Sequence, residues 1–236
     1  MQTGTAEALK RRAAERAAEW IRDGMTVGLG TGSTVRHLLD HLAERRAAGE
    51  WGAVVGVPTS EQTAARAREL GIPLRTLEEA PEVDLTIDGA DEVDPELRLI
   101  KGLGGALLRE KIVATASRRL VIIVDESKVV AKLGTRAPLP VEVDPFGAAI
   151  QPPFLRALGA EPALRPGRDG SPLVTDGGNL IFDCRFPGGI DDPEALEARL
   201  DGRVGVMENG LFLGMASAVV VAGADGVRVM EREGGR

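Results

Sequence analysis

Short apolar segments alternate with helical segments along the first half of the chain, and this alternation constrains the fold most strongly. Such an order predicts parallel strands, because a crossover helix returns the chain to the same edge of the sheet. We therefore expect an α/β fold: a Rossmann-like, mostly parallel sheet with helices on both faces, plus a smaller α+β domain. The predicted strands are 25–29, 53–57, 83–87 and 120–124. Four helices are predicted: 6–22, 35–47, a third that begins at a capping box at 59–62 and ends at 70–71, and 107–117. Thr5 is the predicted cap of the first helix.

The composition changes near residues 138–140, where shorter strands begin to mix with helices. We expect a small, lid-like α+β domain over residues 136–203, with strands at 141–143 and 180–186 and helices at 146–158 and 193–200. The last two predicted strands, 218–222 and 227–230, flank an Asp-Gly turn and return to the large domain. Residues 1–135 and 204–236 then form the α/β catalytic domain.

The net charge of −7 opposes non-specific binding to nucleic acid or to an anionic membrane surface. No apolar stretch approaches the roughly 20 residues that a membrane-spanning helix needs. Residues 1–10 lack the apolar segment of a signal peptide, and a single cysteine, Cys184, cannot form an intramolecular disulfide. We expect a cytoplasmic protein with no nucleic-acid or membrane partner, and we expect Cys184 to be a core residue.

The first predicted strand leads into a loop rich in glycine and hydroxyl side chains, residues 28–34, and then into a helix. Backbone N–H groups and hydroxyls at a helix N-terminus favour an anion, and phosphate above all. A P-loop would need a Lys before its Ser or Thr, and a dinucleotide-binding loop would need Gly where Ser33 stands. The alternative is a tight turn in which Ser33 and Thr34 serve only as helix caps.

Several carboxylates follow the predicted strand 83–87, and their order does not match a calcium loop. Ligands of open parallel sheets bind beyond the carboxyl ends of the strands, so Asp88 and Asp91 are the candidate functional acids. A solvated acidic turn is the simpler interpretation for Glu92, Asp94 and Glu96.

A second glycine-rich loop, 102–105, joins Lys101 to a helix that carries Glu110. Only five of the 29 basic residues are Lys, which draws attention to Lys101 and Lys128 as sites that need a compact charge. A phosphate loop, a lysine and carboxylates in one crevice suit proton transfer beside the carbonyl of a phosphorylated substrate. The alternative is that Glu110 is an ordinary exposed helix acid.

His37 and His41 lie four residues apart on the helix after the first loop, a spacing that can place two imidazoles on one metal ion. Leu38 stands where a zinc protease would carry Glu, and no third ligand is evident. The sequence therefore gives no metal site.

Together these segments resemble type A ribose-5-phosphate isomerase over nearly the whole chain. The matching stretches are 30–34, 87–92, 100–107, 109–111, 127–128, 138–143 and 175–179. The resemblance implies interconversion of D-ribose 5-phosphate and D-ribulose 5-phosphate through an enediolate in the non-oxidative pentose phosphate pathway, with neither metal nor organic cofactor. It also implies a homo-oligomer, either a dimer or a tetramer.

The resemblance further implies roles for particular residues. Glu110 would move a proton between C1 and C2, while Lys101, Asp88 and Asp91 would serve the substrate oxygens. Leu103 and Gly105 depart from the Gly and Ala that are common at these loop positions in the family. The implied substrate-binding residues are Lys10, Thr31, Gly32, Ser33, Thr34, Asp88, Gly89, Ala90, Asp91, Lys101, Gly102, Leu103, Gly104 and Lys128.

The sequence leaves two rival functions open. An amino-sugar phosphate deaminase would need a suitably placed base and a leaving-group acid, and the two histidines follow the wrong loop for that role. A sugar-phosphate sensor would normally accompany a DNA-binding module, which the acidic composition disfavours. We rank both functions below the isomerase.

Overall fold

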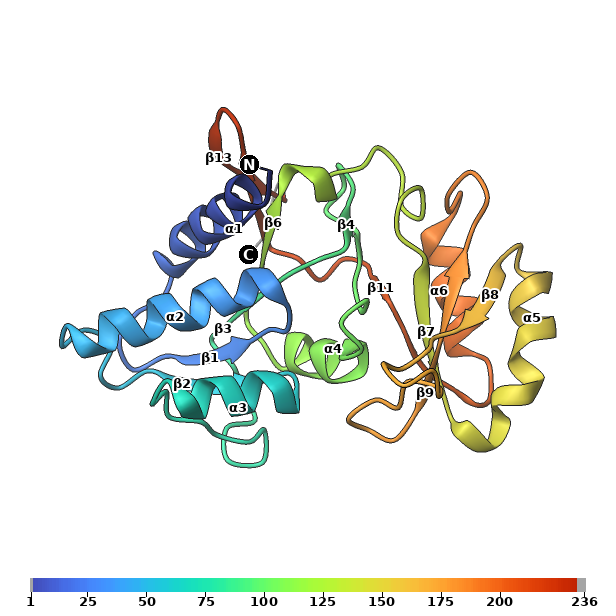
Figure 1. Cartoon of the computed structure of the whole chain (residues 1–236), viewed down its shortest axis with the longest axis horizontal. Coiled ribbons are helices and arrows are strands. Elements are labelled where there is room, and N and C mark those ends of the chain that lie inside the picture. The colour runs from blue at the N-terminus through green and yellow to red at the C-terminus, as the bar shows by residue number, and fades with distance from the viewer. Residues whose placement is uncertain (1, 233–236) are drawn as a thin grey trace. The chain divides into compact units, whose positions relative to one another are not determined.

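The structure, a computed structural model, describes residues 2–232 of the chain (Figure 1). The chain divides into two compact units. The first unit comprises the described residues as far as Ala90, then Arg109–Lys128 and the described residues from Met215 onward. The second unit comprises Asp91–Leu108 and Val129–Gly214, so the chain passes between the units four times.

The first unit is built on a six-stranded sheet in the order β13-β12-β6-β3-β1-β2. Strands β12, β6, β3, β1 and β2 are parallel, whereas the edge strand β13 pairs antiparallel with β12. The predicted mostly parallel sheet and its terminal hairpin are thus confirmed. The strands span Thr26–Leu29 (β1), Val55–Pro58 (β2), Leu85–Asp88 (β3), Leu120–Asp125 (β6), Ala218–Gly223 (β12) and Gly226–Glu231 (β13).

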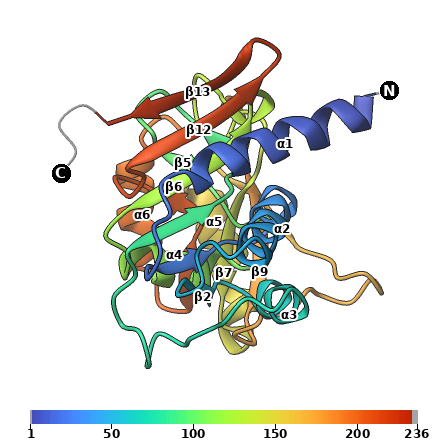
Figure 2. The same cartoon turned by 90° about the vertical axis from the view of Figure 1, so that its left-hand side faces the viewer.

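Helices cover both faces of this sheet. On one face, α1 (Gln2–Ala18) and α2 (Ser33–Ala47) bury their apolar sides against residues such as Ile87; α1 lies across β6 and β12 (Figure 2). The neighbouring residue Thr86 faces the other side, because side chains alternate along a strand. There, α4 (Leu107–Thr115) packs through Val113. The remaining helices of this unit are α3 (Glu61–Glu69), after β2, and the 3₁₀ turn η1 (Glu126–Lys128), after β6.

Two predicted helix caps are wrong. Helix α1 already begins at Gln2 and ends at Ala18, so Thr5 lies inside the helix and cannot cap it. Ser60, rather than Thr59, is the N-cap of α3: its hydroxyl accepts a hydrogen bond from the Thr63 N–H at 3.0 Å. Thr59 instead donates its hydroxyl to a carbonyl of β1.

The second unit contains two antiparallel sheets around its own apolar core. One has the order β10-β7-β9-β8 and the other β11-β5-β4. The strands span Glu92–Val93 (β4), Leu99–Ile100 (β5), Leu139–Val143 (β7), Glu161–Leu164 (β8), Leu180–Arg185 (β9), Val206–Asn209 (β10) and Leu211–Phe212 (β11). The helical segments are η2 (Pro145–Ile150), α5 (Gln151–Ala157) and α6 (Pro193–Asp201). The expected α+β character of the small domain is therefore present.

The second unit is larger than the small domain expected from sequence, because it also includes Asp91–Leu108 and, on either side of the expected range, residues 129–135 and 204–214. The segment Asp91–Leu108 supplies β4 and β5, and β5 pairs with β11, more than a hundred residues later in the chain. Such a distant pairing leaves no local sign at residue 91. Among the described residues, no helix is long and apolar enough to cross a membrane.

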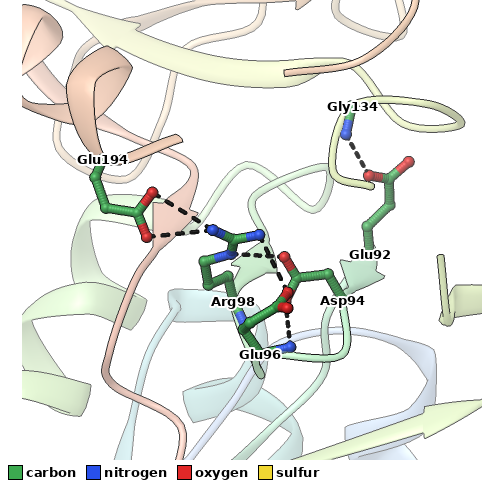
Figure 3. Close-up of polar contacts among 6 residues, drawn as sticks. All are labelled: Glu92, Asp94, Glu96, Arg98, Gly134 and Glu194. Carbon is green, nitrogen blue, oxygen red and sulfur yellow. Dashed lines mark hydrogen bonds and ion pairs between the residues drawn. The ribbon is translucent and has the colours of Figure 1, made fainter. Parts of the chain in front are cut away.

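The acidic segment after β3 is not the solvated turn that we expected for Glu92 and Asp94, since both are fully buried. The Glu92 carboxylate accepts backbone N–H groups from Gly134, Arg136 and Ala137 at 2.5–2.7 Å (Figure 3 draws the first of these). Three donors offset the loss of hydration of this carboxylate. Glu92 therefore ties β4 to the segment before β7.

Asp94 holds the tight connection between β4 and β5 (Figure 3). Its carboxylate accepts the backbone N–H groups of Glu96 and Arg98, and it pairs with the Arg98 guanidinium at 2.6 Å. Arg98 also lies within 3.5 Å of the Glu194 carboxylate. Glu96 is exposed, so the solvated interpretation holds for this residue alone.

Candidate active site

The first unit gathers several candidate residues at one edge of its sheet. Strands β1, β3 and β6 are parallel neighbours, so their carboxyl ends lie at the same edge. The loop 30–34 follows β1, Asp88 ends β3, and Lys128 ends the turn after β6. This is the edge at which open parallel sheets bind ligands.

Gly30 permits the close approach between the first loop and Asp88. A Cβ atom on Gly30 would lie 2.0 Å from Asp88 Oδ1 and 2.6 Å from Asp88 Cα, so only glycine fits. Asp88 is only 1% exposed, and its Oδ1 accepts the N–H groups of Thr31 at 3.0 Å and Gly89 at 2.7 Å. These bonds fix the orientation of the carboxylate against the loop.

The Thr31 hydroxyl is engaged in a cluster of hydroxyl groups at the start of α3. It lies 2.8 Å from the hydroxyls of Thr59 and Ser60 and 3.2 Å from that of Thr63. Thr63 in turn donates to the Gly30 carbonyl at 2.8 Å. The cluster holds the loop in place, a support that local sequence spacing did not reveal because the two segments are about thirty residues apart.

The amino end of α2 follows this loop. Gly32 is its N-cap, with φ 127°, and no side chain hydrogen-bonds at this cap in the described structure. Ser33 and Thr34 are the first helical residues, so the alternative in which they merely cap the helix is wrong. Backbone N–H groups at an uncapped helix start suit an anion.

Glu110 lies toward the same edge of the sheet. One turn further along α4, the Val113 side chain packs closely against Gly28 of β1. A Cβ atom on Gly28 would lie only 2.9 Å from Val113 Cγ1. The Arg118 N–H then bonds to the Val83 carbonyl, so the chain leaves α4 toward the start of β3. Glu110, three residues before Val113, therefore lies nearer to the carboxyl edge than Val113, by at most about 4.5 Å. Its exposed fraction of 3% rules out the alternative of an ordinary exposed acid.

Lys101 belongs to the second unit and is 2% exposed. Its Nζ lies 5.3 Å from the centre of the buried Phe212 ring, a cation–π contact, and its backbone N–H bonds to the Gly210 carbonyl. Phe212 of β11 thus contacts the ammonium group, and Gly210, the residue before β11, holds the backbone of Lys101. A lysine buried in this way is a positioned charge rather than a mobile surface group.

The second glycine-rich loop begins directly after Lys101. Gly102 and Gly105 adopt positive φ values of 105° and 84°, and the Gly105 N–H closes the turn onto the Gly102 carbonyl at 3.0 Å. Asp91 Oδ2 accepts the Leu103 N–H at 2.9 Å. Asp91 therefore organises this loop, and Leu103 fits it with its side chain partly exposed.

The remaining candidates lie in less constrained places. Lys10 on α1 pairs with Glu7 at 2.7 Å, and hydrogen bonds from Lys10 and from His37 hold the pKa of Glu7 below its ordinary value. Lys128 is partly exposed, as is Ala90. Among the described residues, no group of three or more His, Cys, Asp and Glu side chains is arranged to hold a metal ion. Cys184 is in the core of the second unit, as predicted.

Comparison with known proteins gives the family. The sequence model of ribose 5-phosphate isomerase A (phosphoriboisomerase A) matches residues 55–226. This chain belongs to the ribose 5-phosphate isomerase A family. Ribose-5-phosphate isomerase A from Roseiflexus castenholzii is 59% identical over 222 residues, which make up 94% of this chain and 94% of that protein.

Solved structures of the ribose 5-phosphate isomerase A family share the fold described above. The enzyme from Methanocaldococcus jannaschii is 40% identical, has a TM-score of 0.90, and is matched over 95% of this chain and 99% of its own. A D-ribose-5-phosphate isomerase in complex with phospho-erythronic acid is 42% identical, with a TM-score of 0.94 over 96% of this chain and 99% of that chain. The family resemblance and the fold class expected from sequence are both confirmed.

Proposed function

We propose that the chain is an aldose–ketose isomerase that interconverts D-ribose 5-phosphate and D-ribulose 5-phosphate. Family membership supports this activity, and so does the relative whose bound ligand is a phosphorylated acid. The observation that carries the proposal is that the first unit buries two carboxylates, Asp88 and Glu110, and that Asp88 ends a strand at the sheet edge that also bears the uncapped start of α2. An uncapped helix start suits a phosphate, and a buried carboxylate suits a base, which are the two groups that isomerisation of an aldose phosphate needs.

Glu110 acts as the base in this proposal. It takes the C2 proton of the open-chain aldose, which leaves an enediolate, and it returns a proton to C1 to give the ketose. A proton also moves from the C2 hydroxyl to the C1 oxygen, so the reaction gains and loses no atoms.

Lys101, Asp88 and Asp91 serve the substrate oxygens. Lys101 stabilises the charge that develops on oxygen in the enediolate, an interaction stronger in the transition state than in the ground state. Asp88, whose Oδ1 accepts two backbone N–H groups, is the candidate partner of a substrate hydroxyl. Asp91 accepts the Leu103 N–H and so holds the loop after Lys101, in addition to any contact with substrate.

The phosphate is assigned to the start of α2, at Gly32, Ser33 and Thr34, next to Thr31. Lys128 and Lys10 add positive charge. A phosphate held remotely from the reacting carbons supplies binding energy for orientation at C1 and C2. The backbone of Gly89, Ala90, Gly102, Leu103 and Gly104 completes the set of proposed substrate contacts. We further propose that the reaction needs no resident cofactor, and that the protein is a cytoplasmic homo-oligomer, either a dimer or a tetramer.

The test is proton NMR of EDTA-treated protein with D-ribose 5-phosphate in D₂O, following ketose formation and the entry of deuterium at C1 and C2. Wild type should form ketose without added metal. Glu110→Gln should lose turnover while it still binds substrate, because the amide keeps the shape but cannot take a proton. Glu69→Gln, an exposed acid at the end of α3, is the matched control.

Normal kcat in Glu110→Gln would remove Glu110 from the role of base. Substrate binding by wild type with neither ketose nor exchange would replace the isomerase with the sensor. Ammonia release from an amino-sugar phosphate, with no ketose from D-ribose 5-phosphate, would replace it with the deaminase.

A further inference from the structure

Arg165 lies just beyond β8 and is 8% exposed. One side of its guanidinium pairs with Asp183 of β9 through two bonds, Nε to Oδ2 at 2.9 Å and Nη2 to Oδ1 at 2.5 Å. The backbone of Arg165 is fixed as well, because its N–H bonds to the Ile181 carbonyl and its carbonyl accepts the Leu173 N–H. Arg165 is therefore a rigidly held cation within the second unit.

The other side of the guanidinium reaches the glycine-rich loop after Lys101. Arg165 Nη1 donates to the carbonyls of Gly102 at 2.9 Å and Leu103 at 3.1 Å. The Gly102 carbonyl is also the acceptor of the N–H that closes the turn. Four of the five N–H groups of the guanidinium are thus used, two on Asp183 and two on the loop.

Arg165 and Asp91 hold the same peptide group from opposite ends. The carbonyl of the Gly102–Leu103 peptide accepts from Arg165, while its N–H donates to Asp91. A cation on the oxygen and a carboxylate on the nitrogen polarise this peptide and fix its plane. Leu173, two residues before Thr175, packs at the end of the loop, since its Cδ2 lies 3.6 Å from where a Gly105 Cβ would be.

We propose that Arg165, oriented by Asp183, is a positioning residue that fixes the backbone of the loop after Lys101. Only the expected effect on catalysis rests on the proposed function; the role of Arg165 in fixing the loop does not. Glycines at 102, 104 and 105 give this segment many accessible backbone conformations, so the loop needs external bonds to keep one of them. Misplacement of a catalytic group by about 1 Å can cost about a hundredfold in rate, and Lys101 adjoins the clamped peptide.

A purely structural role is the alternative, in which the pair merely joins β8 to β9. The two roles separate in a comparison of Arg165→Met with Arg203→Met. Arg203 also donates to a buried group of the second unit, Gln151 Oε1, at 3.0 Å. Both variants should lower Tm, but only Arg165→Met should lower kcat, by about 10- to 100-fold, with a smaller change in KM.

Two further variants keep the proposal testable if Arg165→Met does not fold. Arg165→Lys keeps the charge but cannot span both partners, so it should lose most of the kcat that Arg165→Met loses. Arg165→Gly should recover kcat when guanidinium ion is added at tens of millimolar, whereas Arg203→Met should not respond. An Arg165→Lys enzyme with wild-type kcat, or an Arg165→Gly enzyme that guanidinium does not improve, would overturn the proposal.

Hydrogen exchange gives a readout that does not depend on isomerase activity. The amides of the peptide that covers residues 99–108 should exchange faster in Arg165→Met than in wild type, and should be unchanged in Arg203→Met. Unchanged exchange in both variants would overturn the clamp. Absence of wild-type turnover would refute the proposed function alone, and the exchange data would still decide the role of Arg165.

Discussion

Glu92→Gln isolates the contribution of a single buried carboxylate, because the change alters neither the length nor the shape of the side chain. Glu92 Oε1 accepts from Arg136 and Ala137, while Oε2 accepts from Gly134. A glutamine can place its one oxygen toward the first two N–H groups, and its NH₂ group then faces the N–H of Gly134. Two bonds lose their charge assistance, and one buried donor is left without an acceptor.

The expected loss of stability is about 3–5 kcal/mol, since each of the two bonds loses about 1 kcal/mol when its charged acceptor becomes neutral, and the orphaned donor costs about 1–3 kcal/mol. In a protein of this size such a loss lowers Tm by about 6–20 °C. Calorimetry measures it, with the exposed Glu96→Gln as control, which should change Tm very little. A Glu92→Gln protein that unfolds within 1–2 °C of wild type, a drop far below the ~6 °C expected, would refute the reasoning.

The burial of Lys101 and of Cys184 can also be tested. Lys101→Ala should lower kcat by roughly 10²–10³ in steady-state assays with D-ribose 5-phosphate, the range for removal of one donor to a developing oxyanion; a rise in KM alone would make Lys101 a binding residue instead. Burial raises the pKa of the Cys184 thiol from 9.0 to about 12, so its thiolate fraction at pH 8 falls about a thousandfold. Iodoacetamide should therefore modify Cys184 quickly in guanidinium chloride, and in the native protein only slowly, at a rate that rises with pH; fast native labelling at pH 8 would contradict the buried position.

The parts of the fold that were predictable from sequence depend on short-range patterns. Alternating apolar strands and helices indicate the parallel sheet, because each crossover is complete within a few tens of residues. The same holds for Asp88, which the strand before it places at the sheet edge. Cys184 was also predictable as a core residue, from the apolar stretch around it.

The parts that were not predictable depend on partners far away in the chain. Burial of Glu92 requires N–H donors from residues more than forty positions later. Arg165 reaches a loop about sixty positions earlier, and nothing beside it in sequence marks that role. A carboxylate or guanidinium side chain is the same residue in the sequence whether water or buried backbone groups surround it. The acidic composition of the segment after β3 therefore led to the prediction that Glu92 is solvated.

The four passages of the chain between the two units have a consequence for biosynthesis. Strand β12 forms the parallel neighbour of β6, yet it is made about a hundred residues later, after the entire second unit. Until that segment leaves the ribosome, β6 presents an unpaired edge of continuous apolar residues, the kind of surface that recruits chaperones or aggregates. Folding of the first unit is therefore expected to finish only after β12 has left the ribosome, and a ribosome that stalls before Ala218 would hold an incomplete sheet.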